Sequence, residues 1–258
     1  MQDDIQASAR VDAQRAHAYF RALAGGAPRV GPFTLNLSPR DSSPYANYAI
    51  PDDDADPSAD QIASLVAAFR ERARTPRLEY VPAAAARVEA RLLAAGFTVE
   101  LRPPFMTKLA RQGEALAFPA RFAWKWASDR DSLSDFVRVS RAAFGEDGPG
   151  EIDARGELWR LSRGGRFLVA SDGAGGAIAG AGAFMPPHAN VTEIVGVAVA
   201  APFRRQGLGQ AIAAQLAQAA FDSGCEMAFL SAAGASQEAI YARAGFISRA
   251  PMLFIAKA

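Results

Sequence analysis

The feature that most constrains the fold of this chain is a short loop, Arg204-Arg205-Gln206-Gly207-Leu208-Gly209. It joins an apolar strand, 192–199, to an apolar-faced helix, 208–223. A helix begins with unpaired backbone N–H groups and a partial positive charge, so its first turn attracts an anion. The two glycines remove side chains that would keep a pyrophosphate from those amides, and the arginines add positive charge. The loop therefore predicts an anion site within a strand–loop–helix unit.

The loop alone also fits an ordinary glycine-containing turn, but its flanks make it more specific. Val197-Ala198-Val199-Ala200-Ala201-Pro202 stands upstream, and Ile240-Tyr241-Ala242-Arg243-Ala244-Gly245-Phe246 stands downstream. With these flanks, the loop resembles the Gln/Arg-x-x-Gly-x-Gly/Ala signature of the GNAT superfamily of acetyl-CoA-dependent N-acetyltransferases. The resemblance covers about residues 120–258. Neither a Walker phosphate loop nor a dinucleotide-binding turn fits, because Gly-Lys-Ser/Thr and Gly-x-Gly-x-x-Gly are both missing.

Strands alternate with helices along the chain, which indicates an α/β or mixed α+β sheet. The resemblance implies the GNAT fold: a central mixed, mostly antiparallel sheet with a splayed strand pair and flanking helices. In the second half, the pattern predicts strands over 122–126, 166–170, 177–184, 192–199 and 227–231, a final strand pair, and helices around 133–144, 157–162, 208–223 and 236–244. In the first half, it predicts helices over 3–24, 62–69 and 84–95 and strands over 33–37, 45–50, 78–81 and 97–101.

The two halves of the chain are similar to each other. Gly245-Phe246 follows Gly96-Phe97 by 149 residues, and this offset aligns the same order of strand, helix, strand, helix and Gly-Phe. We interpret the match as an internal duplication, which gives two GNAT-like units. The predicted division is a degenerate GNAT-like domain at 1–110, a connector at 111–120 and a catalytic GNAT domain at 121–258. The proline-flanked stretch 103–119 is interpreted as linking the two.

The first half has lost the phosphate loop. Under the same offset, that position is surrounded by Asp52, Asp53, Asp54, Asp56 and Asp60. Carboxylates at a helix start satisfy the helix dipole themselves and repel phosphate. We therefore expect no coenzyme A site in the first domain.

The resemblance implies where acetyl-CoA binds. Backbone amides from Arg205 to Gln210 would hold the pyrophosphate, and the strand edge at Val197–Val199 would pair with the pantetheine arm. Ser236 stands where the family often has a coenzyme-binding Asn, although its hydroxyl could cap the helix that follows. The predicted coenzyme-binding residues are Val197, Ala198, Val199, Arg204, Arg205, Gln206, Gly207, Leu208, Gly209, Gln210, Ser236 and Tyr241.

Acyl transfer to an amine needs a base, a stabilised oxyanion and an acid. By the resemblance, Glu193 is the candidate base, the Val199 N–H the oxyanion donor and Tyr241 the acid that protonates the thiolate. Glu193 could instead be an exposed strand-end residue, with a water chain as base, and Tyr241 a half-buried core residue. Cys225 fits a buried thiol better than a nucleophile, because no His or Asp accompanies it.

Composition narrows the remaining classes. Lys plus Arg (28) nearly balances Asp plus Glu (27), so there is no basic footprint for nucleic acid. No apolar run reaches a membrane span, and two distant histidines with a single cysteine predict no metal site. We expect a cytoplasmic monomer or homodimer that acts on an unidentified amine acceptor, with loops 145–150 and 186–190 near its site. The rival hypothesis is a non-catalytic acyl-CoA sensor or scaffold.

Overall fold

The computed structural model describes residues 2–38, 43, 46–111, 116–143, 145, 154–173 and 176–258. For residues 2 and 3 it describes the backbone only. The chain has a mixed α/β fold and forms two compact units. Unit 1 comprises Met1–Met106, Ser231–Gly234 and Ser248–Ala258, and unit 2 comprises Thr107–Leu230 and Ala235–Ile247. Both units are therefore assembled from segments that are discontinuous in sequence.

Unit 1 is built on a six-stranded sheet in the order β1-β2-β3-β4-β13-β5. Its strands are β1 (Arg29–Val30), β2 (Phe33–Leu37), β3 (Asn47–Pro51), β4 (Arg77–Tyr80), β5 (Thr98–Leu101) and β13 (Leu253–Ala256). Its helices are α1 (Gln2–Leu23), α2 (Ala59–Arg70), the 3-10 turn η2 (Pro82–Ala84) and α3 (Val88–Ala94). β3 runs parallel to β4, whereas the other pairs are antiparallel.

The second sheet has seven strands in the order β12-β6-β11-β10-β9-β8-β7. They are β6 (Pro104–Leu109), β7 (Phe122–Trp126), β8 (Arg166–Asp172), β9 (Ile178–Phe184), β10 (Val191–Val199), β11 (Met227–Ser231) and β12 (Ile247–Pro251). The helices of unit 2 are α4 (Arg130–Ala143), α5 (Arg155–Ser162), η3 (Ala201–Phe203), α6 (Leu208–Asp222) and α7 (Ala235–Arg243). β8 and β9 pair as antiparallel neighbours, and β10 pairs in parallel with β11.

Helix α2 illustrates how local sequence sets the elements of unit 1. Ser58 caps it: its Oγ accepts from the Gln61 N–H at 3.2 Å, while the Gln61 side chain accepts from the Ser58 N–H at 2.9 Å. This reciprocal capping box satisfies two amides that the helix leaves unpaired. Ile62, Leu65 and Phe69 follow at helical spacing and are buried in the core of unit 1.

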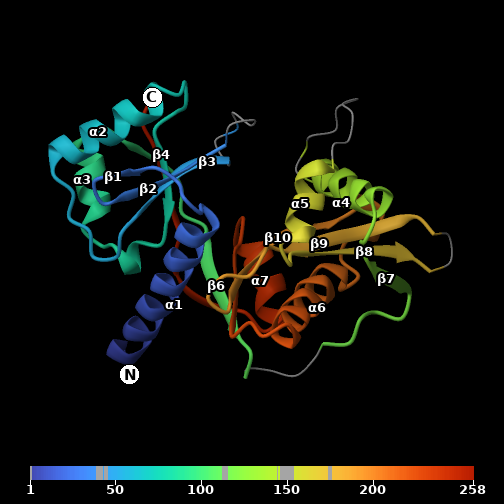
Figure 1. Cartoon of the computed structure of the whole chain (residues 1–258). Coiled ribbons are helices and arrows are strands. Elements are labelled where there is room, and N and C mark those ends of the chain that lie inside the picture. The colour runs from blue at the N-terminus through green and yellow to red at the C-terminus, as the bar shows by residue number, and fades with distance from the viewer. Residues whose placement is uncertain are drawn as a thin grey trace. The chain divides into compact units, whose positions relative to one another are not determined.

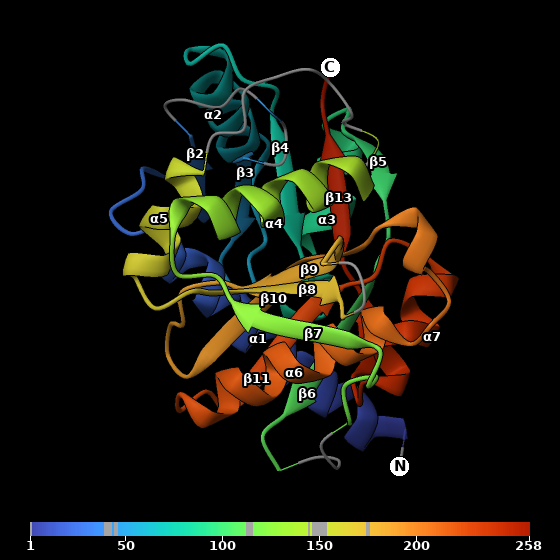
Figure 2. The same cartoon turned by 90° about the vertical axis from the view of Figure 1, so that its right-hand side faces the viewer.

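Unit 2 has a helix on each face of its sheet. Figure 2 shows α4 and α6 on opposite sides of β8, β9 and β10, and both helices pack on those strands. The α4 face buries Leu133, Phe136 and Val139, while α6 buries an almost wholly apolar surface centred on Ile212 and Leu216. Burial on both faces leaves the sheet's ends and edges as the places where a ligand can reach backbone.

Each sheet contains one strand from the opposite half of the sequence. The last strand of the chain, β13, lies between β4 and β5 and pairs with both (Figure 1; Figure 2). Conversely, β6 lies between β11 and β12 in the second sheet. We call this arrangement the strand exchange.

Two sequence predictions are wrong because of the strand exchange. The stretch 103–119 is not only a link, since it contains β6, in which Phe105, Met106 and Thr107 are buried. The final two strands do not pair with each other, since β12 and β13 belong to different sheets. A third difference is local: the helix predicted over 84–95 begins only at Val88, after η2 and a short turn.

A buried ion pair spans the inserted strand in unit 1. The Arg77 side chain, 3% exposed, contacts Glu79 on its own strand and places Nε 2.6 Å from Glu100 Oε2 on β5. Its guanidinium lies 5.1 Å from the ring centroid of Phe254 on β13. Arg77 therefore connects β4 to β5 across the strand that separates them.

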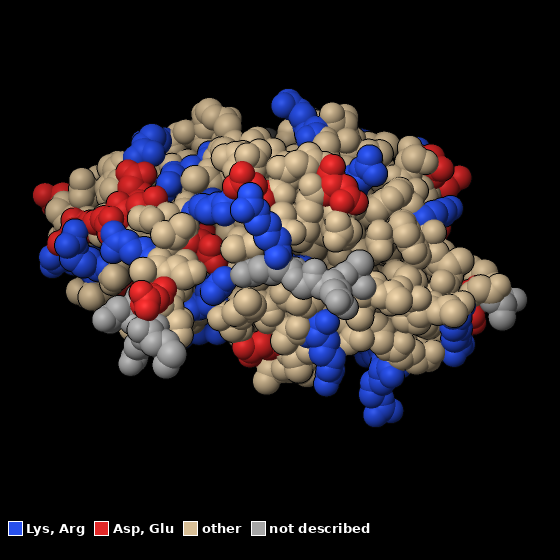
Figure 3. All heavy atoms as spheres, turned by 90° about the horizontal axis from the view of Figure 1, so that it is seen from below, with Lys and Arg blue, Asp and Glu red and all other residues tan. Residues whose placement is uncertain are grey.

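Charged side chains of both signs are interspersed on the face drawn in Figure 3, where red and blue atoms lie side by side. The near balance of 28 basic and 27 acidic residues agrees with this mixture. The described residues of that face form no extended field of one sign. Among the described helices, none has the length and apolarity needed to span a membrane.

Candidate active site

The centre of the candidate site is a break in the pairing of β10. Toward β11, β10 pairs in parallel only over Val191–Glu193. Toward β9, the register shifts between Val195 and Ala198, so β10 carries one extra residue, a β-bulge. Gly196 supplies the required φ of +62°, and a Cβ there would lie 3.0 Å from the Phe136 ring. Beyond Glu193, β10 and β11 no longer pair, so these two strands diverge.

The divergence leaves backbone groups of β10 facing the gap. The Ala200 N–H donates to the Ala179 carbonyl on the β9 side, at 2.9 Å. N–H groups alternate sides along an antiparallel pair, so the Val199 N–H points away from β9, toward β11. On that same side, the Val199 carbonyl accepts a 3.1 Å hydrogen bond from Arg204 Nε. This strand edge can thus donate a hydrogen bond to a ligand in the gap.

The loop after β10 is shaped to present amides. Arg205 has a φ of +60° and Gly207, the residue before α6, a φ of +79°. A non-glycine residue in this region costs about 1 kcal/mol or more, and such turns form concave rows of N–H groups that bind anions. Among the described residues, none accepts a hydrogen bond from the amides of residues 205–210. These amides and the α6 dipole fit a pyrophosphate.

The loop, the strand edge and helix α7 meet at Gly209. A Cβ at Gly209 would lie 3.6 Å from Val199 Cγ2 and 3.7 Å from Ile240 Cγ2. Ile240 immediately precedes Tyr241 in α7. The structure thus brings the phosphate-loop helix, the Val199 end of β10 and the helix of Tyr241 into one place.

Tyr241 is half-buried, and its ring lies 6.4 Å from that of Phe246. Burial raises the pKa of Tyr241 to about 12. The phenol therefore keeps its proton at neutral pH, as a group that donates a proton must. The same environment also fits a tyrosine of the core edge, the alternative left open by the sequence.

Glu193 is the last residue of β10 that pairs with β11, opposite Phe229. It stands at the mouth of the divergence, and its side chain is of intermediate exposure. Its carbonyl accepts from the Met185 N–H at 2.9 Å, which anchors this point of the strand. A carboxylate at this position can take part in proton transfer within the gap.

The structure also gives the positions of Ser236, Cys225 and the two loops expected near the acceptor. Ser236 is the second residue of α7, not its cap, and its Oγ lies 2.7 Å from Gln237 Oε1. Cys225 is 4% exposed, and burial raises the pKa of its thiol, so it is a core residue. Of the two loops expected near the acceptor, 146–150 lies outside the described residues. In the other, His188 pairs through its backbone with Val191.

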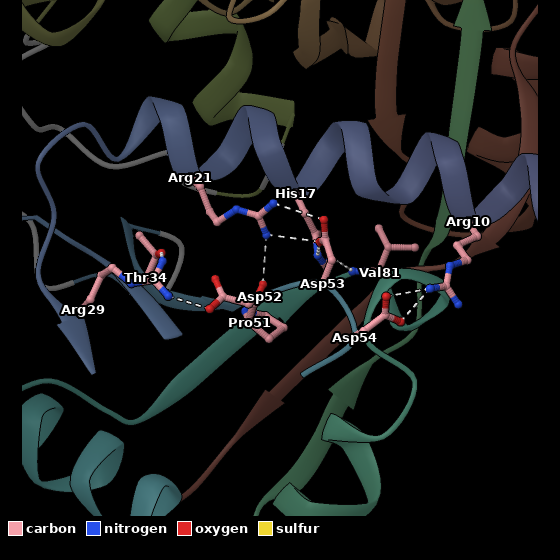
Figure 4. A network of polar contacts seen from close by, with 10 residues as sticks. All are labelled: Arg10, His17, Arg21, Arg29, Thr34, Pro51, Asp52, Asp53, Asp54 and Val81. Carbon is pink, nitrogen blue, oxygen red and sulfur yellow. Dashed lines mark hydrogen bonds and ion pairs between the residues drawn. The ribbon is translucent and has the colours of Figure 1, made fainter. Parts of the chain in front are cut away.

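The matching position in unit 1 is filled by ion pairs (Figure 4). Each of the loop aspartates Asp52, Asp53, Asp54 and Asp56 contacts at least one arginine. The pairs are Asp52–Arg29 (2.5 Å), Asp53–Arg21 (3.2 Å), Asp54–Arg10 (2.6 Å), and Asp56 with Arg87 (3.3 Å) and Arg91 (2.8 Å). The cap of α2 is Ser58, and Asp60 lies in its first turn.

His17 completes that network from α1. Its Nε2 accepts from the Val81 N–H at 3.0 Å, so the ring proton is on Nδ1, 3.1 Å from Asp53 Oδ1. The side chain is fully buried, and burial lowers the pKa of His17 below its ordinary value of 6.5. His17 is therefore neutral in the folded protein at pH 7.

One contact beside the phosphate loop was missed from the sequence. Arg121 donates to Gln206 Oε1 at 2.8 Å, and its guanidinium lies 5.6 Å from the Phe203 ring centroid. A separation of 85 residues hides this contact from any local pattern. Arg121 adds a cation next to the predicted anion site.

Comparisons with known proteins agree with this geometry. Residues 132–246 match the model of the acetyltransferase (GNAT) family. No curated protein sequence matches the chain. The structure is similar to a GCN5-related N-acetyltransferase from Kribbella flavida, with 20% identity, 95% of each chain covered and a TM-score of 0.80.

Two further solved structures share the fold. One is a GCN5-related N-acetyltransferase from Sphaerobacter thermophilus, with 15% identity, 87% of this chain and 75% of that one covered, and a TM-score of 0.63. The other is a tandem GNAT protein from the clavulanic acid biosynthesis pathway, with 16% identity, 81% and 77% covered, and a TM-score of 0.59. At these identities the likeness concerns the fold.

The chain is a mixed α/β protein, and the match over 132–246 identifies it as an acyltransferase. The second half of the chain contains a domain of the GNAT acetyltransferase family, as the match over 132–246 shows. The chain as a whole has the architecture of GNAT proteins, including a tandem one.

Proposed function

We propose that the protein is an N-acetyltransferase that moves an acetyl group from acetyl-CoA directly to a primary amine of a small molecule or peptide. The observation that carries this proposal is the place of Gly209 beside both Val199 and Ile240, where an added Cβ would lie 3.6 Å and 3.7 Å from their Cγ2 atoms. It supports a single site in which a coenzyme bound at the α6 amides has its thioester between the Val199 N–H and α7.

The residues in the gap supply the chemistry. Glu193 takes the proton of the attacking ammonium, directly or through water, because an alkyl ammonium has a pKa of about 10 and must lose it to become a nucleophile. The amine nitrogen then bonds to the acyl carbon. The Val199 N–H stabilises the negative charge that develops on the carbonyl oxygen. As the carbon–sulfur bond breaks, Tyr241 gives its proton to the leaving thiolate. The second proton of the amine nitrogen then passes through water to the Tyr241 phenolate, which leaves a neutral amide and restores the acid.

The coenzyme residues divide by role in this proposal. Amides of the loop and the first turn of α6 bind the pyrophosphate, with side-chain charge nearby, and the bulged part of β10 pairs with the pantetheine amides. Ser236 is the weakest member of the set, because its hydroxyl is engaged with Gln237. The loop set is Arg204, Arg205, Gln206, Gly207, Leu208, Gly209 and Gln210, and the strand set is Val197, Ala198 and Val199.

Unit 1 has no coenzyme role in this proposal. The four loop aspartates and their arginine partners fill the position where the pyrophosphate would approach, and the capping box occupies the first amides of α2. A calorimetric titration with acetyl-CoA is expected to find one site per chain. Two sites per chain would contradict this part.

The deciding experiment is a thiol-release assay with acetyl-CoA and a panel of primary amines, followed by mass spectrometry of the products. An acetyltransferase releases free coenzyme A and adds one acetyl group to an amine of the panel. A protein that binds acetyl-CoA in calorimetry but releases no thiol with any amine is the non-catalytic sensor instead.

A further inference from the structure

The C-terminal end of α7 is held by a lysine from the first half of the sequence. Lys108 on β6 is 5% exposed, and its Nζ donates to the carbonyl oxygen of Ala244 at 2.9 Å. The side chain passes so close that a Cβ at Gly245 would lie 3.1 Å from it. A cation at a helix C-terminus satisfies a carbonyl that the helix leaves unpaired and interacts favourably with its dipole.

This helix end also carries Tyr241. The Ala244 and Phe246 N–H groups both donate to the Tyr241 carbonyl at 3.0 Å, and Gly245 closes the turn with a φ of +90°. Fixing the Ala244 carbonyl therefore fixes the last turn, and with it the backbone from which the Tyr241 phenol projects. Burial lowers the pKa of Lys108, which marks a cation removed from water at this point.

We infer that Lys108, supplied by the strand exchange, is a positioning residue that holds Tyr241 in place for proton transfer to the thiolate. The inference rests on the proposed acid role of Tyr241. The first half of the chain has lost its own phosphate loop, but in this inference it still takes part in the reaction. It contributes β6 and the Lys108 cation, which hold the helix that carries Tyr241.

Unit 1 contains a matched control. Lys257 donates from Nζ to the Ala95 carbonyl at 2.6 Å, at the end of α3 and beside Gly96, whose φ is +84°. Lys257 lies 149 residues after Lys108, the offset that also relates Gly245 to Gly96. The residue corresponding to Tyr241 there is Leu92, which has no proton to give. Loss of Lys257 removes the same kind of contact at a helix that carries no proposed catalytic residue.

The test compares Lys108→Met with Lys257→Met in the full chain. Lys108→Met is expected to lower kcat by about tenfold or more, since small displacements of a catalytic group are costly. Acetyl-CoA affinity is expected to stay unchanged, and Lys257→Met is expected to leave kcat at the wild-type value. In a Tyr241→Phe background, Lys108→Met should cause no further loss. Equal effects of the two lysine variants, or losses that multiply in the double variant, would overturn the inference.

A second readout does not need turnover. The Tyr241 phenol is followed by ultraviolet difference titration, with Tyr241→Phe subtracted, and is expected to titrate at lower pH in Lys108→Met because a loosened helix end exposes it. An unshifted titration overturns the positioning of Tyr241 by Lys108, whereas full turnover in Tyr241→Phe overturns the proposed acid role on which the inference rests. If Lys108→Met does not fold, Lys108→Gln keeps a donor on a shorter side chain and provides the same comparison.

Discussion

Lys257 donates a 2.6 Å hydrogen bond to the carbonyl oxygen of Ala95, from which it is separated by 162 residues. Lys108 makes the corresponding contact with Ala244 at 2.9 Å. In each case the lysine and the helix it holds come from opposite halves of the sequence. The two contacts are reciprocal under the 149-residue offset, and we infer that they descend from one duplicated arrangement in which β6 and β13 were exchanged between the two sheets.

The strand exchange makes the two halves depend on each other. Removing β13 would leave β4 and β5 without the strand between them, and removing β6 would do the same to β11 and β12. Leu253 and Ile255 of β13 are fully buried in the core of unit 1. A cut between the halves would therefore expose apolar surface in both sheets.

Tyr241→Phe tests the proposed acid. The ring and its packing against Phe246 remain, so the free energy of unfolding should change little. Turnover should fall by about a hundredfold or more, since a general acid contributes on the order of 10²–10⁴. Steady-state kinetics with the amine found in the panel, together with acetyl-CoA calorimetry, measures both effects. Wild-type turnover would contradict the assignment.

Glu193→Gln tests the proposed base. The variant should be slow at neutral pH and recover as the pH approaches about 10, where the amine substrate is already neutral. The measurement is kcat/KM against pH for both proteins. Parallel profiles for wild type and variant would assign the base to a water chain.

Gly207→Ala tests the anion site. Gly207 has a φ of +79°, and Gly224, with a φ of +97° and open space around it, is the matched control. Alanine in this region costs each variant about 1–2 kcal/mol of stability. Only Gly207→Ala should weaken acetyl-CoA binding, by about tenfold, which corresponds to about 1.4 kcal/mol. Equal affinity losses in calorimetry would show that the loop does not bind the pyrophosphate.

Arg77→Met tests the ion pair that spans β13. It leaves Glu79, 13% exposed, without its cation, and should cost about 3 kcal/mol of unfolding free energy. Arg10→Met removes an exposed pair in the same unit, where the side chains are 50% and 57% exposed, and should cost less than about 1 kcal/mol. Urea unfolding monitored by circular dichroism compares them. A cost of Arg77→Met no larger than that of Arg10→Met would contradict the role.

His17 predicts acid sensitivity of unit 1. Its folded pKa is lowered, so the unfolded chain binds a proton first, and stability present above pH 6.5 is lost as the pH falls below that value. The expected slope is up to about 1.4 kcal/mol per pH unit. His17→Gln should remove this slope, because an amide can donate to Asp53 and accept from Val81 at any pH. His188→Gln should retain it. An unchanged slope in His17→Gln would refute the prediction.

Much of the fold was readable from local patterns. The strands 33–37, 122–126 and 227–231 were predicted with their observed bounds, and α6 and α7 to within one residue at each end. These segments were predictable because period, apolar residues and the glycine before α6 are properties of neighbouring residues. The site residues were proposed from a motif in the same way, and their chemical roles remain predictions.

The sequence by itself determined that an apolar strand, an amide-presenting loop and a helix follow one another at 192–223, because that depends on consecutive residues. The tertiary structure alone decided which strands share a sheet. It placed β13 between β4 and β5, turned the stretch at β6 from a link into a buried strand, and brought Lys108 to the end of α7. The physical reason is that the backbone N–H and C=O groups along a strand are the same for every possible partner strand. Which strands pair is therefore set by burial of side chains across the whole fold.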